Sequence, residues 1–171
     1  MDKNPRVPWG APVLVLCRDA MEKERLLLDL LGGGGPAVLL DTDLLHTGYA
    51  RSLVGAPPAE VLNPAGPAWR DGIARIADRA SRERILVVLD TLNGAYGIGE
   101  GQGHVRAVNS CVMLLARSCK EAGSALVVLA TGRQLRDGRW VLAPGGRRLP
   151  GWAAAFLLRG SQVEPLGQTP L

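Results

Sequence analysis

The sequence contains few of the residues that build metal sites and disulfide frameworks. Among its 171 residues are three cysteines, with no Cys-x-x-Cys pair, and two histidines that are far from one another. These counts exclude a disulfide-stapled fold and disfavour a structural zinc site, because zinc needs about four clustered thiolate or imidazole ligands. We therefore predict no metal site, and we expect Cys17, Cys111 and Cys119 to be buried thiols in a reducing compartment.

Long apolar runs and the motifs of secreted or hydrolytic proteins are also missing. No run approaches the roughly 18 apolar residues that span a bilayer. The segment before Pro12 lacks the apolar region of a secretory signal. No Gly-x-Ser-x-Gly elbow is present, which leaves a serine hydrolase with little support. The sequence thus predicts a soluble, cytoplasmic protein without membrane partners.

The sequence does contain four apolar runs of strand length. They lie at Pro12–Cys17, Ala37–Asp41, Ile85–Asp90 and Ala125–Thr131. Continuous Val/Ile/Leu runs are typical of parallel strands that are buried on both faces. Helical patterns separate them, at Arg25–Leu31 with Asp19 as a plausible N-cap, at Trp69–Arg82 and at Val105–Ala122.

This alternation predicts an α/β fold with three α/β/α layers and a mostly parallel central sheet. Two runs beyond Thr131, at 139–143 and 151–159, predict further strands that run antiparallel. The Pro/Gly-rich stretch 55–67 is expected to be a connector. One domain suffices for this length. We assign 1–10 to an amino-terminal extension, 11–160 to the core domain and 161–171 to a carboxyl-terminal tail.

Acidic residues follow two of the predicted strands, at the edge of a parallel sheet where ligands bind. Asp90 ends one strand, and Asp41-Thr42-Asp43 ends another. Beyond Asp90, glycine stands at nearly every second position from Gly94 to Gly103, which predicts a mobile loop at the same edge.

The phosphate-binding loop expected before the first helix is not intact. The pattern G-x-x-x-x-G-K-[ST] places Lys23 on its lysine, but Cys17 and Glu22 stand where glycines are needed. Glu24 replaces the hydroxyl residue that holds magnesium. Glycine allows backbone N–H groups to close around phosphate without a Cβ in the way. We interpret Lys23 as a charge in the first turn of a helix, with phosphate binding as the alternative.

The net charge of +4 is confined to one segment of the chain. Residues 1–132 carry fourteen basic and fourteen acidic side chains, whereas residues 133–171 carry six arginines and two acids. Clustered positive charge is typical of nucleic-acid binding, with an arginine-rich solvated surface as the alternative. The predicted DNA-binding residues are Arg133, Arg136, Arg139, Arg147 and Arg148.

The order of these pieces resembles the ATPase core of the RecA/RadA recombinase family, from about residue 12 to residue 159. Asp41-Thr42-Asp43 stands at the place of the family's Asp-Thr-Glu element, and Ile85–Asp90 is similar to its Walker B strand. Tyr96–Gly103 resembles its first DNA loop, and Ala125–Gln134 resembles its strand ending in Thr-Asn-Gln. Ala143-Pro144-Gly145-Gly146 is similar to its Pro-x-Gly-Gly stretch. The resemblance implies a RecA-like fold.

The departures from the family's pattern concern the nucleotide site. The intact phosphate loop is absent, and Asp43 replaces the glutamate that would position the attacking water, with a side chain one methylene shorter. A Phe-x-x-Ala polymerisation motif is also missing. Such a core resembles a RadA paralogue, an accessory to the recombinase. We predict no catalytic residue and disfavour bound ATP and magnesium; the candidates for any nucleotide site are Lys23, Asp43 and Asp90.

Three functions fit these observations. The first is a non-catalytic RecA-like module in recombination and repair that binds DNA, with single strands favoured, or a RecA/RadA-type recombinase or other RecA-like paralogue. The second is an active ATPase of the RecA/KaiC type with a non-standard loop. The third is a pure protein-interaction subunit. We favour the first because the arginines are localised; Trp140 and Trp152 are expected in packing, with base stacking as the alternative.

Overall fold

The structure, a computed structural model, describes residues 12–32, 35–42, 60–62, 69–99, 101–143, 145–151 and 154–167. Its centre is a sheet in the order β3-β2-β4-β5-β1-β8-β9. The strands are β1 (Pro12–Cys17), β2 (Ala37–Asp41), β3 (Glu60–Leu62), β4 (Leu86–Asp90), β5 (Ala125–Gln134), β8 (Ala154–Arg159) and β9 (Gln162–Pro165). All four strands predicted from apolar runs are present, and they occupy the middle of the sheet.

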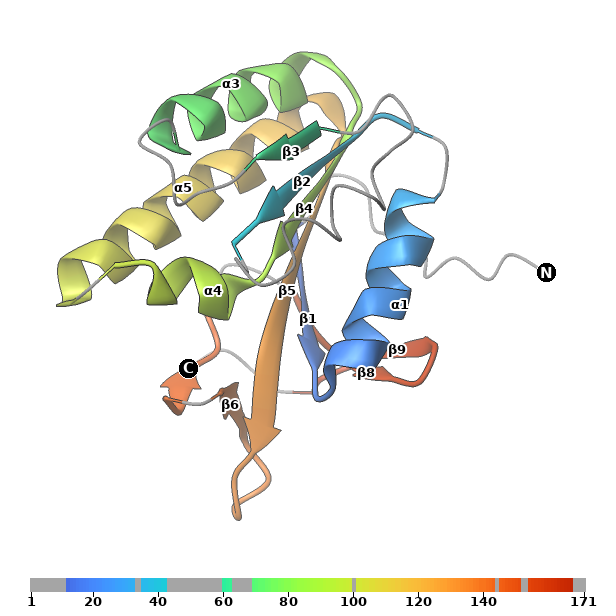
Figure 1. The fold of residues 1–171 in the computed structure, drawn as a ribbon, viewed down its shortest axis with the longest axis vertical. Helices are drawn as coiled ribbons and strands as arrows, with labels where there is room; N and C mark the ends of the chain where they lie inside the picture. Colours follow the sequence, from blue (N-terminus) through green and yellow to red (C-terminus); the bar gives the residue numbers. More distant parts are fainter. Residues whose placement is uncertain are drawn as a thin grey trace.

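Pairing within the sheet is parallel from β3 to β8 and becomes antiparallel only between β8 and β9. The antiparallel carboxyl-terminal strands are therefore confirmed, except that β8 itself runs parallel to β1. The strand β5 continues past the sheet and pairs antiparallel with β6 (Trp140–Leu142), which pairs in turn with β7 (Arg147–Arg148). Figure 1 shows this extension below the sheet, with the long arrow of β5 leading into it. We call residues 131–148 the arginine hairpin.

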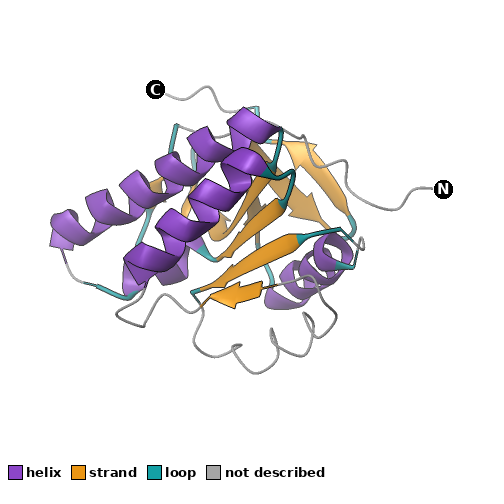
Figure 2. Ribbon diagram, turned by 90° about the horizontal axis from the view of Figure 1, so that it is seen from above, coloured by secondary structure: helices purple, strands orange, loops and turns teal. Residues whose placement is uncertain are grey.

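Helices cover both faces of the sheet and complete three layers. On one face lie α3 (Trp69–Arg82) and α5 (Gly101–Ala122), and on the other lies α1 (Ala20–Leu31), as Figure 2 shows. The predicted helix at Trp69–Arg82 has the observed bounds. Its apolar residues recur at helical spacing, so that one side of α3 is buried and the other carries its charges.

The core consists of two clusters that the sheet separates. One cluster joins the sheet to α3 and α5 through residues such as Leu89, Ile76 and Leu115. The other joins it to α1 through residues such as Val88 and Leu27. Neighbouring positions on β4 contribute to opposite clusters because successive strand residues point to opposite faces.

Two stretches differ from the sequence-based expectations. The strand β3 lies within the stretch 55–67, which was expected to be a connector. The expected mobile loop after Asp90 is instead a short helix, α4 (Leu92–Gly97), followed closely by α5. Packing explains Gly94 in α4: a Cβ there would lie 2.8 Å from the backbone oxygen of Thr42. The glycine permits close approach of α4 to the end of β2.

Within the part of the chain that the structure describes, no helix is both long and apolar enough to cross a bilayer.

Candidate functional site

The turn from β1 to α1 lies at the carboxyl edge of the sheet and is two residues long. Arg18 and Asp19 alone join Cys17, the last residue of β1, to Ala20, the first residue of α1. Asp19 has an extended backbone and is the N-cap, as predicted from the sequence. Its carboxylate Oδ1 accepts hydrogen bonds from the backbone N–H groups of Met21, at 2.6 Å, and Glu22, at 3.4 Å.

This capping arrangement determines what the helix start can bind. The unpaired N–H groups at a helix N-terminus are the groups that bind phosphate in nucleotide-binding folds. Here two of them bind the carboxylate of Asp19. A phosphate approaching the same groups would also meet the negative charge of that carboxylate. The carboxylate of Asp19 therefore occupies the N–H groups that would otherwise bind a phosphate.

Lys23 completes the first turn of α1, and its side chain is buried. Its Nζ is 2.8 Å from Oδ1 of Asp90, at the end of β4, and the two side chains are only 6% and 4% exposed. The sequence-based interpretation placed Lys23 in the first turn of a helix, which is confirmed, but it did not foresee burial or this ion pair. Two of the three candidates for a nucleotide site are thus brought together. The third, Asp43, lies outside the described residues.

A second acid stands next to this pair. Asp41 is the register partner of Asp90 on the adjacent strand β2, and both are almost completely buried. Register partners in neighbouring strands point to the same face, and alternation along β2 and β4 makes this the face that α1 covers. Lys23 therefore lies over a buried surface that carries two carboxyl groups.

Thr42 joins the ends of β2 and β4 beside these acids. Its hydroxyl donates to the backbone oxygen of Thr91 at 2.5 Å and accepts from the N–H of Thr91 at 2.7 Å. Its own N–H donates to the oxygen of Asp90 at 2.8 Å. Thr91 in turn caps α4 through a bond from the N–H of Gly94. Thr42, which stands at the threonine of the family's Asp-Thr-Glu element, thus has a structural role in linking the ends of β2 and β4.

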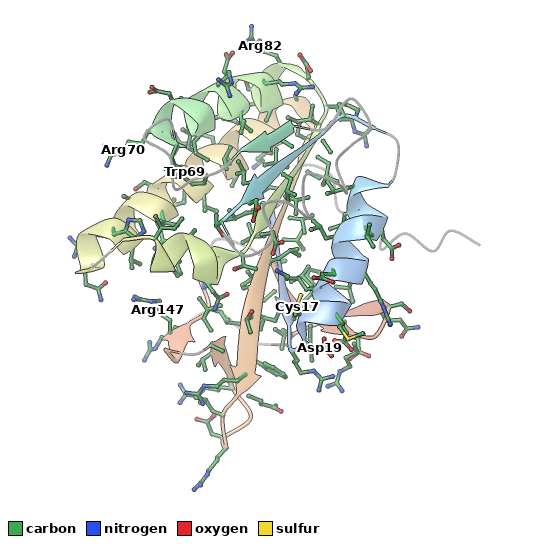
Figure 3. All side chains as sticks on the ribbon, in the orientation of Figure 1. Cys17, Asp19, Trp69, Arg70, Arg82 and Arg147 are labelled. Carbon is green, nitrogen blue, oxygen red and sulfur yellow. The ribbon has the colours of Figure 1, made fainter. Side chains whose placement is uncertain are left out.

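Cys17 and Glu22 occupy the positions where the phosphate-loop pattern requires glycine. Burial raises the pKa of the Cys17 thiol from its ordinary value of 9.0 to about 12; Lys23 opposes the rise, and Asp90 and Glu22 add to it. The carboxylate of Glu22 accepts a hydrogen bond from the N–H of Gly160 at 3.0 Å. Figure 3 labels Cys17 and Asp19 at the lower end of α1. A buried, neutral thiol and a partly buried glutamate therefore stand at the two positions where the pattern requires glycine.

Across the described ranges, no three His, Cys, Asp or Glu side chains come together in a way that could hold a metal ion. The chemistry available at the helix start is that of a buried ion pair and a capped helix.

The arginine hairpin lies outside the nucleotide-site region and carries the five predicted DNA-binding residues. Arg133 of β5 and Arg148 of β7 both align with Val141 of the middle strand β6, so they point to one face. Arg147 aligns with Leu142 and Gly132 and points to the other face. This second face packs on the protein, since Leu142 belongs to the core and Leu16 lies against Gly132.

The remaining two predicted arginines lie near the tip of the arginine hairpin. Arg136 is exposed in the turn that follows β5. Arg139 is also exposed, and its guanidinium lies 2.7 Å from a carboxylate oxygen of Asp137. Because Arg139 is two positions before Val141, strand alternation places it on the face of Arg133 and Arg148. Four of the five arginines therefore lie on the outward face or at the tip.

Arg147 is the exception, because it contacts an aromatic ring. Its guanidinium carbon lies 5.4 Å from the ring centroid of Tyr96 in α4. The Tyr96 hydroxyl donates to Oδ1 of Asn109 in α5 at 2.6 Å. Figure 3 shows Arg147 below α4, between the helix and the arginine hairpin. Neither Tyr96 nor Asn109 was a candidate from the sequence, since nothing in a glycine-rich stretch indicates a cation–π partner.

The two tryptophans considered for base stacking can be placed only in part. Trp140 is 9% exposed and belongs to the core cluster, which confirms packing as its role. Trp152 lies outside the described residues.

The comparisons with known proteins identify the architecture. No family model and no curated protein matches the sequence. Among solved structures, a RadB recombinase matches with a TM-score of 0.55 and 17% identity over 74% of this chain. The chain has a RecA-like fold. A structure described as a DnaB-like replicative helicase and its interactions with primase matches with a TM-score of 0.58 and 11% identity over 88% of the chain.

Both matched structures are longer than the matched region. The RecA-like chain spans 64% of the RadB recombinase structure and 47% of the helicase structure.

Proposed function

We propose that this RecA-like chain is a non-catalytic accessory protein of DNA recombination and repair, similar to a RadA paralogue, that binds DNA, a RecA/RadA-type recombinase or both. The fold supports the class, because the similar structures include a recombinase and a replicative helicase. The observation that carries the proposal is the outward placement of arginines on a hairpin that extends β5 beyond the core. Such residues can contact phosphates without reading sequence.

The helix start supports the non-catalytic part. An ATPase of this fold needs backbone N–H groups and a lysine directed at phosphate. In this chain the carboxylate of Asp19 accepts from those N–H groups, and Lys23 is paired with Asp90 beneath the helix. Binding of Mg-ATP would require a longer turn and the separation of a buried ion pair. We therefore disfavour ATP and magnesium as ligands.

The proposal is tested by fluorescence anisotropy with a labelled oligo(dT) strand and a duplex of the same length, at several salt concentrations. We expect affinity that falls linearly on a log–log plot of binding constant against salt, because binding releases counterions. The variant Arg133→Ala/Arg136→Ala/Arg148→Ala should weaken binding to both probes. Affinity that is unchanged between low and physiological salt, or unaffected by these substitutions, would contradict the DNA-binding role. The two probes also test the preference for single strands.

A pure interaction subunit is the second candidate, and α5 favours it. Met113 and Leu114 are 51% and 42% exposed on the outer surface of this helix. Exposed apolar side chains of this kind occur at protein-binding surfaces. Co-purification with a recombinase that is lost in Met113→Ser/Leu114→Ser, together with no DNA binding by the wild-type chain, would favour this candidate over the first.

A further inference from the structure

The short helix α4 contacts β5, the residue that follows β6, and β7 of the arginine hairpin. Asn93 accepts a hydrogen bond from the N–H of Thr131 in β5 at 2.8 Å and donates to the oxygen of the same residue at 3.1 Å. The same amide donates to the oxygen of Ala143, the residue after β6. Tyr96, one turn further along α4, lies under Arg147 of β7. Asn93 and Tyr96 together fix the arginine hairpin to the protein.

The last of these strands depends most on its contact with α4. The strand β7 is two residues long and, among the described strands, pairs with β6 alone. Gly146, which precedes it, has a φ of +69°, a conformation that favours glycine. A side chain there would also crowd Arg133, whose Nη2 lies 3.3 Å from the position that a Cβ would take. Two backbone pairs and a tight turn give little support on their own. Leu149, just after β7, packs against the core, and the contact of Arg147 with Tyr96 ties β7 to α4.

The ring that receives Arg147 is held in place and uncharged. The hydrogen bond to Asn109 fixes the Tyr96 hydroxyl, and the ring packs against the core cluster. Burial raises the pKa of Tyr96 above its ordinary value of 10.0, against the opposing effects of Arg147 and Asn109. A neutral ring near a guanidinium gives a cation–π contact. Arg147 is exposed, but its guanidinium is directed at the Tyr96 ring.

We propose that Arg147 is a positioning residue and not a phosphate ligand: by binding Tyr96 it pins β7 to α4, so that Arg148 points outward beside Arg133. The ligand that this outward face fits is a phosphodiester backbone. No described aromatic side chain is exposed on it, and Trp140 lies on the opposite face. The inference rests on the proposed DNA-binding function. It assigns four of the five arginines to phosphate contact and the fifth, Arg147, to holding β7 against α4, a role that we call the latch.

Matched methionine variants test this division. Methionine keeps an unbranched apolar stem over the Tyr96 ring and removes the charge. Arg148→Met should reduce the slope of log affinity against log salt by about 0.7 for single strands and 0.9 for duplex, the value of one phosphate contact. Arg147→Met should leave the slope at the wild-type value. A slope reduced equally by both substitutions would overturn the assignment of Arg147.

Hydrogen exchange tests the latch without any ligand. Arg147→Ala and Tyr96→Leu should each accelerate amide exchange in residues 141–149, because local opening of β7 becomes easier. Arg148→Ala should leave exchange in this segment unchanged. Unchanged exchange in Arg147→Ala would overturn the latch. If the wild-type chain binds neither DNA probe, the proposed DNA-binding role and the phosphate face both fail, and the exchange measurement still decides whether Arg147 holds β7.

Discussion

At the residue scale, the ion pair of Lys23 and Asp90 joins the first turn of α1 to the end of β4. Both side chains are almost fully buried, and each is within 2.8 Å of the other. Removing two charges from water is costly, and their attraction offsets that cost only while both are present. The pair is therefore a poor source of net stability but a strong constraint on substitution.

Substitutions at the two positions should be strongly coupled. Lys23→Met and Asp90→Leu should each lower the free energy of unfolding by about 3–5 kcal/mol, because each leaves one charge buried without its partner. The double variant should lose less than the sum of the two single variants. Urea denaturation monitored by circular dichroism gives the four values of the cycle.

An exposed ion pair of α3 provides the control for this cycle. Arg82 pairs with Asp78, and both side chains are more than half exposed. Arg82→Met should change the free energy of unfolding by about 0.5 kcal/mol or less. If the effects of Lys23→Met and Asp90→Leu were additive, the two buried charges would not be energetically coupled.

The buried thiols give a prediction at alkaline pH. The pKa of Cys17 and that of Cys119 are both raised to about 12 by burial. Between pH 9 and 12 the unfolded chain loses thiol protons that the folded chain keeps, so stability should fall as pH rises through this window. The slope is at most about 1.4 kcal/mol per pH unit for each thiol.

Unfolding of the wild-type chain and of Cys17→Ala/Cys119→Ala at several pH values measures this effect. The double variant should show a shallower decline above pH 9 than the wild-type chain. Parallel declines in the two proteins would mean that other groups account for the loss.

At the scale of elements, the position of the short helix α4 depends on Gly94, which allows the helix to approach Thr42 closely. A side chain at Gly94 would lie 2.6 Å from the hydroxyl and 2.8 Å from the backbone oxygen of Thr42, the residue that bridges β2 and β4. The backbone of Thr42 cannot move aside for a new Cβ as easily as the end of a flexible side chain could. The position therefore tolerates only glycine while α4 and β2 keep their places.

Alanine substitutions at two helical glycines should have opposite effects. Gly94→Ala should destabilise by about 1–3 kcal/mol through overpacking. Gly103→Ala, in the first turn of α5 with open space around it, should be neutral or stabilise by up to about 1 kcal/mol, because alanine favours helix. Thermal unfolding of both variants measures the difference. Equal effects at the two positions would show that Thr42 can give way.

The elements with a strong local pattern could be predicted from the sequence. The apolar runs at 12–17, 37–41 and 125–131 are strands, as expected for short Val/Leu-rich runs in a parallel sheet covered on both faces. The helix at Trp69–Arg82 followed from its amphipathic spacing, and Asp19 followed from its preference for N-cap positions.

The features that depend on contacts distant in sequence could not be predicted. The partner of Lys23 is 67 residues away, and a lysine between two glutamates reads as a surface charge. The glycines of α4 led to the prediction of a mobile loop, because the close approach of Gly94 to Thr42 leaves no pattern in the neighbouring sequence. Which arginine faces inward depends on the register of three strands. These features depend on contacts between residues that are distant in the sequence, and no short stretch of sequence encodes them.

At the scale of the whole molecule, the RecA-like fold carries a first helix whose start is capped by Asp19. The fold is similar to those of a RadB recombinase structure and a DnaB-like helicase structure. Within the 161–171 segment, β9 adds to the sheet and Leu166 is buried in the core.

Mg-ATP should leave the thermal stability of the chain unchanged. A ligand present at about 1,000 times its dissociation constant stabilises a protein by about 4 kcal/mol, so a micromolar site would raise the melting temperature clearly at 1 mM. We expect no such shift, because the first N–H groups of α1 bind Asp19. Calorimetric titration provides an independent check. Micromolar binding by either method would promote the ATPase alternative above the proposed function.

The length of β5 has a mechanical consequence. The same strand that carries the arginine hairpin runs between β4 and β1 and is hydrogen-bonded to both over most of its buried half. A partner that pulls on the hairpin along this axis would load those bonds together in shear instead of opening them one by one. Tension applied at the tip would therefore be transmitted directly to the centre of the molecule.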